Sequence, residues 1–305
     1  PGEVLVKMAA SPINPSDLAA LEEQYAVDWR FPVVPGLEGA GTVVDARAGR
    51  MGTLVMGRKV SVFAGRQGLW AEYAPVPVDQ AIPVGRRIGF EQAAMSLVNP
   101  LTAIALVGIA RQRGVTAVVN TAAAGALGRM IRKRAVASGM KVINIVRREE
   151  HVTALKAEGA VHVLNQNDES FVKDLRHLTN HYRATLAFDA IGGDMTVNLL
   201  SGLPKRGEVM IYGGLAMAPS PVTPDHFIFH NKHISGFWLV NWLNGLSLPQ
   251  KLWHIRDVQR SFAGFAGSDV AQILDLSEAL TAPAEYASDM SAGKTLITPD
   301  KTLLA

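Results

Sequence analysis

The chain has 305 residues, of which 48% are hydrophobic and 19% are charged, and it contains no cysteine. This length favours two domains, and the absence of thiols excludes disulfides, thiolate metal sites and cysteine nucleophiles. The formal net charge of +3 and the lack of a long apolar run indicate neither a nucleic-acid nor a membrane partner. The absence of cysteine fits a reducing compartment, so a cytoplasmic protein is expected.

The first hundred residues are predicted to be β-rich and irregular. Strand-like runs occur at 3–7, 42–44 and 59–63, and frequent prolines argue against long helices. At the other end of the chain, helices are expected at 249–261 and 269–280.

After Pro100, short apolar runs alternate with helical patterns. Strands are predicted at 117–121, 141–146, 161–164, 185–188, 208–212 and 233–238, and helices at 127–138, 149–158, 169–178 and 195–200. Such alternation with short connections indicates parallel strands joined by right-handed crossovers. The predicted fold class is α/β, with a doubly wound Rossmann sheet at 100–242 between the β-rich residues 1–99 and a helical tail.

The stretch NTAAAGALGRM, residues 120–130, follows the first predicted strand of that sheet. In a doubly wound sheet this turn carries glycines, and the next helix offers its N-terminal N–H groups to a pyrophosphate. Gly125 is expected to face the phosphates, and Gly128 to let the helix pack closely on the sheet. Taken alone, the same pattern also suits a plain strand-to-helix turn.

The end of the second strand predicts which dinucleotide is bound. Arg147 stands nineteen positions after Gly128, with Arg148 beside it, and no acidic residue precedes them in the strand. An acid at this place would hold a ribose 2′-hydroxyl, whereas an arginine accommodates a 2′-phosphate, so NADPH is predicted over NADH. The alternative is that both arginines pair only with Glu149, Glu150 or solvent.

The sequence resembles the zinc-independent branches of the medium-chain dehydrogenase/reductase superfamily, namely the quinone oxidoreductases and the enoyl thioester reductases. The matching segments follow the family's order along nearly the whole chain: PGEVLVKMAASPINPSD, VVPGLEGAGTVV, LWAEYAPVP, FEQAAMSLVNPLTA, NTAAAGALG, VINIVRREEH, LKAEGAVHVLN, FDAIGG, RGEVMIYGG, GFWLVNW and AGKTLITP. The resemblance implies that residues 1–99 and 243–305 together form a β-rich, GroES-like catalytic domain.

The resemblance also separates the branches of the superfamily. Zinc alcohol dehydrogenases carry a cysteine where this chain has Asn14 or Pro15, and a histidine where it has Leu37. The resemblance therefore implies hydride transfer without zinc, from NADPH to a quinone or an α,β-unsaturated carbonyl compound. A homodimer formed along the edge strand 233–239 is expected as well.

Individual site residues follow from the resemblance by position. Tyr25, a few residues after the NPSD segment, resembles the tyrosine that donates a proton or orients substrate in the enoyl thioester reductases; the alternative is a packed loop tyrosine. The residues implied to contact the cofactor are Asn14, Thr102, Ala123, Gly125, Ala126, Leu127, Ala190, Gly213, Gly214, Phe237, Trp238 and Lys294.

Two other functions stay open at the level of the sequence. The first is a 2-enoyl thioester reductase acting on acyl-CoA or acyl-carrier-protein substrates. The second is an NADPH-binding protein with a structural or regulatory role and little activity.

Overall fold

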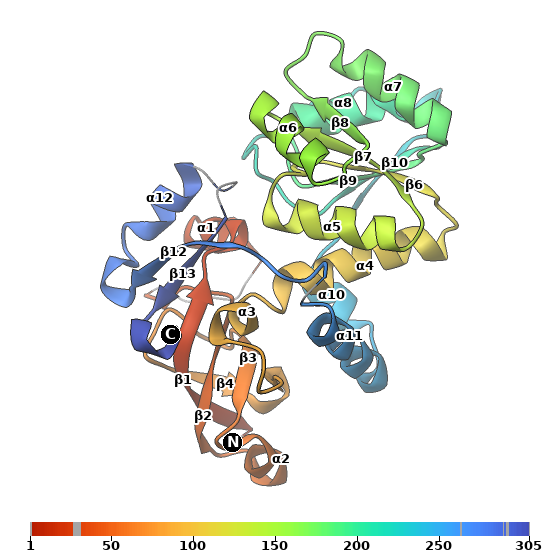
Figure 1. Cartoon of the computed structure of the whole chain (residues 1–305). Helices are drawn as coiled ribbons and strands as arrows, with labels where there is room; N and C mark the ends of the chain where they lie inside the picture. The colour runs from red at the N-terminus through yellow and green to blue at the C-terminus, as the bar shows by residue number, and fades with distance from the viewer. Residues whose placement is uncertain (1, 27–31, 263, 289, 291–292, 305) are drawn as a thin grey trace. The chain divides into compact units, whose positions relative to one another are not determined.

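The computed structural model describes residues 2–26, 32–262, 264–288, 290 and 293–304. The chain divides into two compact units (Figure 1). Unit 1 comprises Pro1–Pro100 and Ile255–Ala305, and unit 2 comprises Leu101–His254. None of the helices formed by the described residues combines the length and the apolar character needed to cross a bilayer.

Unit 2 is built around a six-stranded parallel sheet with the strand order β11-β10-β9-β6-β7-β8. Its strands are β6 (Ala117–Asn120), β7 (Lys141–Val146), β8 (His162–Asn165), β9 (Leu186–Asp189), β10 (Glu208–Ile211) and β11 (His233–Gly236). This is the strand order of a Rossmann fold. Successive strands are added on one side of β6 up to β8, and on its other side from β9 onward, so the strand order reverses between β6 and β9. The predicted fold class is therefore confirmed.

Helices cover both faces of this sheet (Figure 1). The helices along this part of the chain are α4 (Val98–Gln112), α5 (Ala126–Ala137), α6 (Glu149–Ala157), α7 (Phe171–Tyr182), α8 (Asp194–Gly202), α9 (Asp225–Ile228), α10 (Leu239–Asn244) and α11 (Leu248–Arg260). Of these, α4 and α11 run across the boundary between the two units.

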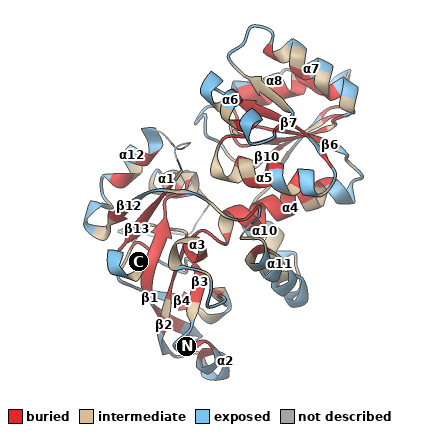
Figure 2. Ribbon diagram, viewed as in Figure 1, coloured by how far each residue is buried: buried red, intermediate tan, exposed pale blue. Residues whose placement is uncertain are grey.

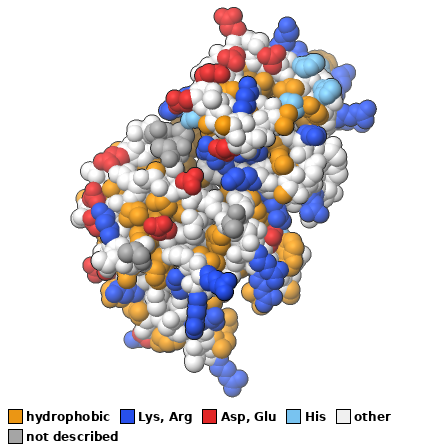
Figure 3. Space-filling model, viewed as in Figure 1, with side chains coloured by type: hydrophobic (Ala, Val, Ile, Leu, Met, Phe, Trp, Pro, Cys, Tyr) orange, Lys and Arg blue, Asp and Glu red, His pale blue; other side chains and the backbone are white. Residues whose placement is uncertain are grey.

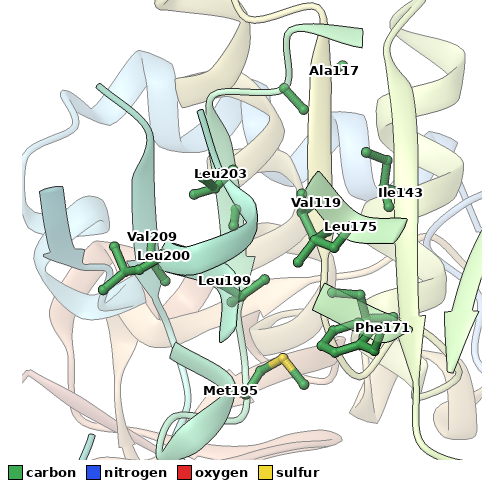
Figure 4. Packing of buried hydrophobic residues seen from close by; sticks show 13 residues of the cluster. Ala117, Val119, Ile143, Phe171, Leu175, Met195, Leu199, Leu200, Leu203 and Val209 are labelled. Carbon is green, nitrogen blue, oxygen red and sulfur yellow. The ribbon is translucent and has the colours of Figure 1, made fainter. Parts of the chain in front are cut away.

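One face of the sheet is covered by α7 and α8. Figure 4 shows Leu175 of α7 and Leu199 of α8 packed against Val119 and Ile143 of the sheet, and all four side chains are fully buried. Because the central strands β6, β7 and β9 are covered on both faces, they are buried and largely apolar (Figure 2).

Unit 1 contains a seven-stranded mixed sheet with the strand order β12-β13-β1-β2-β3-β5, in which β4 also pairs with β1. Its strands are β1 (Glu3–Pro12), β2 (Glu38–Ala46), β3 (Lys59–Phe63), β4 (Tyr73–Pro77), β5 (Ala81–Pro83), β12 (Val270–Asp275) and β13 (Lys294–Thr298). The short helices are α1 (Pro15–Leu21), α2 (Gly49–Val55), α3 (Phe90–Ala94) and α12 (Ala282–Ser288), with 3₁₀ turns η1 (Val78–Gln80), η2 (Leu276–Glu278) and η3 (Lys301–Leu304).

The helix predicted at 269–280 is wrong. Residues Val270–Asp275 form strand β12, which pairs in parallel with β13, and a 3₁₀ turn follows. Val270, Ile273 and Leu274 have the i, i+3, i+4 spacing of a helix, but pairing with a remote strand overrides that local preference.

Candidate cofactor site and a buried polar network

The turn between β6 and α5 is tight and is tied to the neighbouring strand. Ala122 adopts a φ of +46°, a left-handed conformation that is uncommon for a residue with a Cβ. Gly125 donates its N–H to the Ala122 carbonyl oxygen at 3.0 Å and is the N-cap residue of α5. The Ala123 N–H donates to the carbonyl oxygen of Ile145 in β7 at 3.1 Å. The turn is thus held at the carboxyl end of two adjacent strands.

Gly128 sits where helix and turn come closest. A Cβ built on Gly128 would lie 2.4 Å from the carbonyl oxygen of Ala122 and 2.7 Å from the Cα of Ala123, so no larger residue fits without a backbone shift. The buried Asn120 side chain donates from its Nδ2 to the Gly128 carbonyl oxygen at 3.0 Å. At Gly125 the same construction meets only the Ala122 oxygen, at 3.3 Å. The outer side of the turn is therefore open to a ligand.

The two strands at the reversal point are joined by polar side chains. The Thr121 hydroxyl oxygen accepts the Ala190 N–H at 2.8 Å and lies 3.3 Å from Oδ1 of Asp189. Asp189 also accepts the N–H of Ile191 at 2.9 Å and the hydroxyl of Thr196 at 2.7 Å. Thr121 and Asp189 were not predicted from the sequence, and they hold together the edge at which Rossmann folds bind their ligands.

Five residues predicted on later turns lie at this edge, namely Ala190, Gly213, Gly214, Phe237 and Trp238. A Cβ on Gly213 would lie 2.8 Å from the Ala190 carbonyl oxygen, and the Leu215 N–H donates to that oxygen at 3.1 Å. Gly214, next to Gly213, is exposed. Phe237 follows the edge strand β11, and its N–H donates to the Ile211 carbonyl oxygen at the end of β10 at 2.8 Å. Half-buried Trp238 comes next and is the N-cap residue of α10.

The end of β7 carries the two predicted arginines. Arg147 is exposed, and its carbonyl oxygen accepts a hydrogen bond from Nδ2 of Asn167 at 2.8 Å. Arg148 lies 3.1 Å from Oε1 of Glu150 through its Nη1 atom. Since β6 and β7 are parallel neighbours, both arginines lie at the same sheet edge as the turn before α5. Two positively charged side chains therefore follow β7 at the edge where the turn before α5 lies.

These residues fit the phosphate groups of a dinucleotide. The first N–H groups of a twelve-residue helix have no intrahelical partner, and the helix dipole adds positive potential there. Because Gly128 has no Cβ, the first turn of α5 packs closely against Ala122 and Ala123. Ala126 and Leu127, the first residues of α5, are half-buried at this end of the helix.

Unit 1 holds two of the predicted cofactor residues, Asn14 and Lys294, within a buried polar network. The Lys294 ammonium donates to Oδ1 of Asn14, and Nδ2 of Asn14 donates to Oε1 of Glu38 at 3.0 Å. Asp17 accepts the backbone N–H of Asn14 at 2.7 Å and that of Leu37 at 2.8 Å. All four side chains, Asn14, Asp17, Glu38 and Lys294, are at most 3% exposed.

The fold explains how residues 280 positions apart meet. Strand β13 runs antiparallel to the end of β1, with Pro12 opposite Leu296, and the Ile13 N–H donates to the Thr295 carbonyl oxygen at 2.9 Å. Lys294, the first residue of β13, is thereby brought beside Asn14. Asn14 in turn caps α1 in a capping box with Asp17.

Burial controls the protonation of this network. It raises the pKa of Asp17 to about 7, although the N–H groups of Asn14 and Leu37 oppose the change. Burial likewise raises the pKa of Glu38, against the charge of Lys294, and it lowers the pKa of Lys294, against both carboxylates. Asp17 and Glu38 were missed from the sequence; the N-x-x-D capping pattern of Asn14 and Asp17 was the only local signal.

The two remaining predicted residues lie on helical segments or beside them. Thr102 is a buried residue of α4. Tyr25 follows α1 and is half-buried.

Among the residues that the structure describes, no three His, Asp or Glu side chains are grouped so that they could hold a metal ion. Lys and Arg side chains are spread over the face shown in Figure 3, with Asp and Glu among them.

Comparison with known proteins extends these observations. Residues 1–86 match the family model described as alcohol dehydrogenase GroES-like domain, and residues 126–251 match that described as zinc-binding dehydrogenase. The mitochondrial enoyl-[acyl-carrier-protein] reductase of Caenorhabditis elegans is 31% identical over 252 residues, which cover 79% of this chain and 70% of the relative. The Xenopus tropicalis enzyme of the same name is 33% identical over 251 residues, with the same coverage of both chains.

A solved structure matches both units. The crystal structure of a Mesorhizobium loti protein assigned as an NADPH:quinone reductase is 34% identical, with a TM-score of 0.90, and the match covers 98% of this chain and 87% of that one. The family predicted from the sequence motifs is confirmed. The chain belongs to the medium-chain dehydrogenase/reductase superfamily and is an oxidoreductase of that family.

Proposed function

We propose that this chain is an NADPH-dependent reductase that delivers hydride to quinones or to activated enones without zinc. The observation that carries the proposal is the sheet edge where Arg147 and Arg148 follow β7, one strand away from the turn closed by Gly128. Positive side chains at this place suit the 2′-phosphate that distinguishes NADPH from NADH. The name of the Mesorhizobium loti relative, an NADPH:quinone reductase, is consistent with this assignment.

The chain's own residues would bind and orient the cofactor. The first amides of α5, with Ala123, Gly125, Ala126 and Leu127, hold the pyrophosphate, while the arginines after β7 hold the 2′-phosphate. The proposed contacts of the ribose and nicotinamide in unit 2 are Thr102, Ala190, Gly213, Gly214, Phe237 and Trp238. Asn14 and Lys294 are also proposed as cofactor contacts. When bound, NADPH supplies the hydride, and the protein supplies orientation and exclusion of water.

Tyr25 is the proposed proton donor. Its phenol would hydrogen-bond the oxygen that becomes an enolate, and would return a proton after hydride transfer. Tyr25→Phe should lower kcat by about 10²-fold, with little change in NADPH affinity. Tyr73→Phe is the matched control, because Tyr73 is an exposed tyrosine of β4 in the same unit. Equal kcat values for the two variants would remove Tyr25 from the mechanism.

A 2-enoyl thioester reductase is the second candidate. It is favoured by the names of the two animal relatives, both enoyl-[acyl-carrier-protein] reductases. The decisive assay follows NADPH oxidation with a panel of quinones, enones, enals and crotonyl thioester. Faster turnover of quinones or enones supports the proposal, and a preference for crotonyl thioester supports the second candidate. Tight NADPH binding without turnover of any acceptor would indicate a structural or regulatory role.

A homodimer is the proposed assembly. Strand β11 pairs only with β10 among the described strands, so one of its edges is open to a second copy. Ile228 and Phe229 near it are each 70% exposed, and Ile234 within it is 38% exposed. An open strand edge beside apolar side chains favours pairing of two identical edges about a twofold axis.

A further inference from the structure

Three buried side chains from separate segments of unit 1 are connected in series by hydrogen bonds, an arrangement called the relay below. The Lys294 ammonium donates to the oxygen of the Asn14 amide, and the nitrogen of that amide donates to the Glu38 carboxylate at 3.0 Å. Lys294 begins β13, Glu38 begins β2, and Asn14 precedes α1. The Asn14 amide therefore separates a buried cation from a buried anion.

This arrangement permits only one orientation of the amide. An ammonium group can only donate hydrogen bonds, and an ionised carboxylate can only accept them. A reversed Asn14 amide would set its NH₂ group against Lys294 and its oxygen against Glu38, so that both contacts would be repulsive. The two charges thus fix the rotamer of Asn14 and also which atom points each way.

Glu38 has a second attachment through its other carboxylate oxygen. Oε2 accepts the backbone N–H of Val98 at 2.9 Å and that of Leu97 at 3.3 Å. Val98 is the first residue of α4, the helix that carries Thr102 one turn later. One carboxylate therefore fixes both the Asn14 amide and the start of the helix that bears a second proposed nicotinamide contact.

Stability alone does not account for the relay. Burying a carboxylate and an ammonium costs desolvation energy that their attraction often fails to offset, and apolar replacements of such groups are frequently neutral or stabilising. Glu38 and Lys294 are 0% and 3% exposed, and no contact within salt-bridge distance joins them directly. The two charges attract each other, but the hydrogen bonds that connect them run through the Asn14 amide.

We propose that Glu38 is a positioning residue, which orients Asn14 with Lys294 and sets the start of α4 for cofactor binding and hydride transfer. This role rests on the proposed function, in which Asn14 and Thr102 lie beside the nicotinamide. It predicts that removing both buried charges, without restoring the hydrogen bonds of the relay, will restore the melting temperature. NADPH affinity and kcat will stay low.

The test compares Glu38→Gln, Lys294→Met and the double variant with the wild-type chain. Melting temperature, NADPH dissociation constant and kcat with the best acceptor of the panel are measured for each. Each single variant leaves one buried charge unbalanced, and both should melt at lower temperature than wild type. The double variant should regain most of the lost melting temperature, because both charges are gone.

The double variant should nevertheless bind NADPH about tenfold more weakly, the effect of losing one oriented hydrogen bond, and should lose up to about 10²-fold in kcat. Glu72→Gln, at an exposed carboxylate of the same unit, is the control and should match wild type. A double variant that regains both melting temperature and NADPH affinity would overturn the positioning role.

The proposed function fails in a distinguishable way. If the wild-type chain binds NADPH but reduces no acceptor, the reductase assignment is lost, while the affinity comparison still decides the role of Glu38. If the wild-type chain binds no NADPH, both proposals are overturned together. If only the double variant folds, its NADPH affinity relative to wild type decides the role of Glu38.

Discussion

Gly128 and Ala122 approach each other so closely that the carbonyl oxygen of Ala122 would lie 2.4 Å from a Cβ at position 128. This approach lets α5 start directly above the strand end, where its N-terminal amides face outward. The turn between β6 and α5 thus depends on a hydrogen atom where every other residue type has a carbon.

Gly128→Ala is expected to destabilise the chain by about 1–3 kcal/mol, because the added methyl group must displace the backbone. NADPH affinity should fall with it. Gly108→Ala is the matched control: a Cβ on this glycine of α4 meets nothing within 4 Å, and alanine should stabilise the helix by up to about 1 kcal/mol. Urea denaturation checks both, and equal effects would show that the close approach is unimportant.

Arg147→Asp should raise the Michaelis constant for NADPH roughly 10–100-fold, since a charge-assisted contact with the 2′-phosphate is replaced by repulsion. The Michaelis constant for NADH should change little. Lys205→Asp makes the same change of charge at an exposed residue before β10, at the opposite end of the strands, and should affect neither cofactor. An equal loss for NADPH and NADH in the Arg147 variant would contradict the assignment.

Asp17 should make folding stability decrease as the pH rises through the mildly acidic range. Burial raises its pKa from 3.8 to about 7, so between these values the folded chain holds a proton that the unfolded chain has released. By linkage the contribution is greatest below about pH 4, and up to about 4 kcal/mol of it is lost by pH 7. Glu38, Lys294 and Tyr286 are the titratable neighbours that share this environment.

The measurement is urea denaturation at several pH values for wild type, Asp17→Asn and Asp45→Asn. Asp17→Asn removes the titrating group, so its stability should fall less between pH 4 and 7 than that of wild type. Asp45→Asn changes an exposed carboxylate and should follow the wild-type curve. Parallel curves for all three proteins would disprove the role of Asp17.

Ile234→Lys should convert a dimer into a monomer. A charge within the edge strand β11 would be buried against its symmetry mate, at a cost larger than a single apolar contact contributes. Val161→Lys, at a side chain 79% exposed, is the control and should leave the assembly unchanged. Sedimentation velocity distinguishes the two states, and a wild-type chain that sediments as a monomer would refute the dimer.

Much of unit 2 could be predicted because its elements are local. The strand predicted at 141–146 coincides with β7, and that at 59–63 in unit 1 coincides with β3. Buried parallel strands read as short apolar runs, and the helices between them show their own period. The tight turn between β6 and α5 was predictable for the same reason, since its glycines and its strand are contiguous in sequence.

The buried network of unit 1 was less predictable. Asn14 and Lys294 meet only because β13 pairs with β1, and Glu38 joins them from a third segment. The glutamate of GLEGAG, between Leu37 and Gly39, carries no local sign that it will be fully buried. Strand β12 was predicted as a helix for the same reason. Its pairing with β13 is not visible in the local sequence pattern of residues 269–280.

The pairing of β1 with β13 also constrains the order in which the chain can fold. Ser11 lies opposite Ile297, and the Thr298 hydroxyl donates to the carbonyl oxygen of Ala9 at 2.7 Å. During synthesis, unit 2 is complete before this ladder can form, so the early strands of unit 1 must wait for their last partners. Domains generally fold as they emerge, and long-range strand pairing is slow. Unit 1 is therefore the later of the two to mature, and the more exposed to misfolding while it waits.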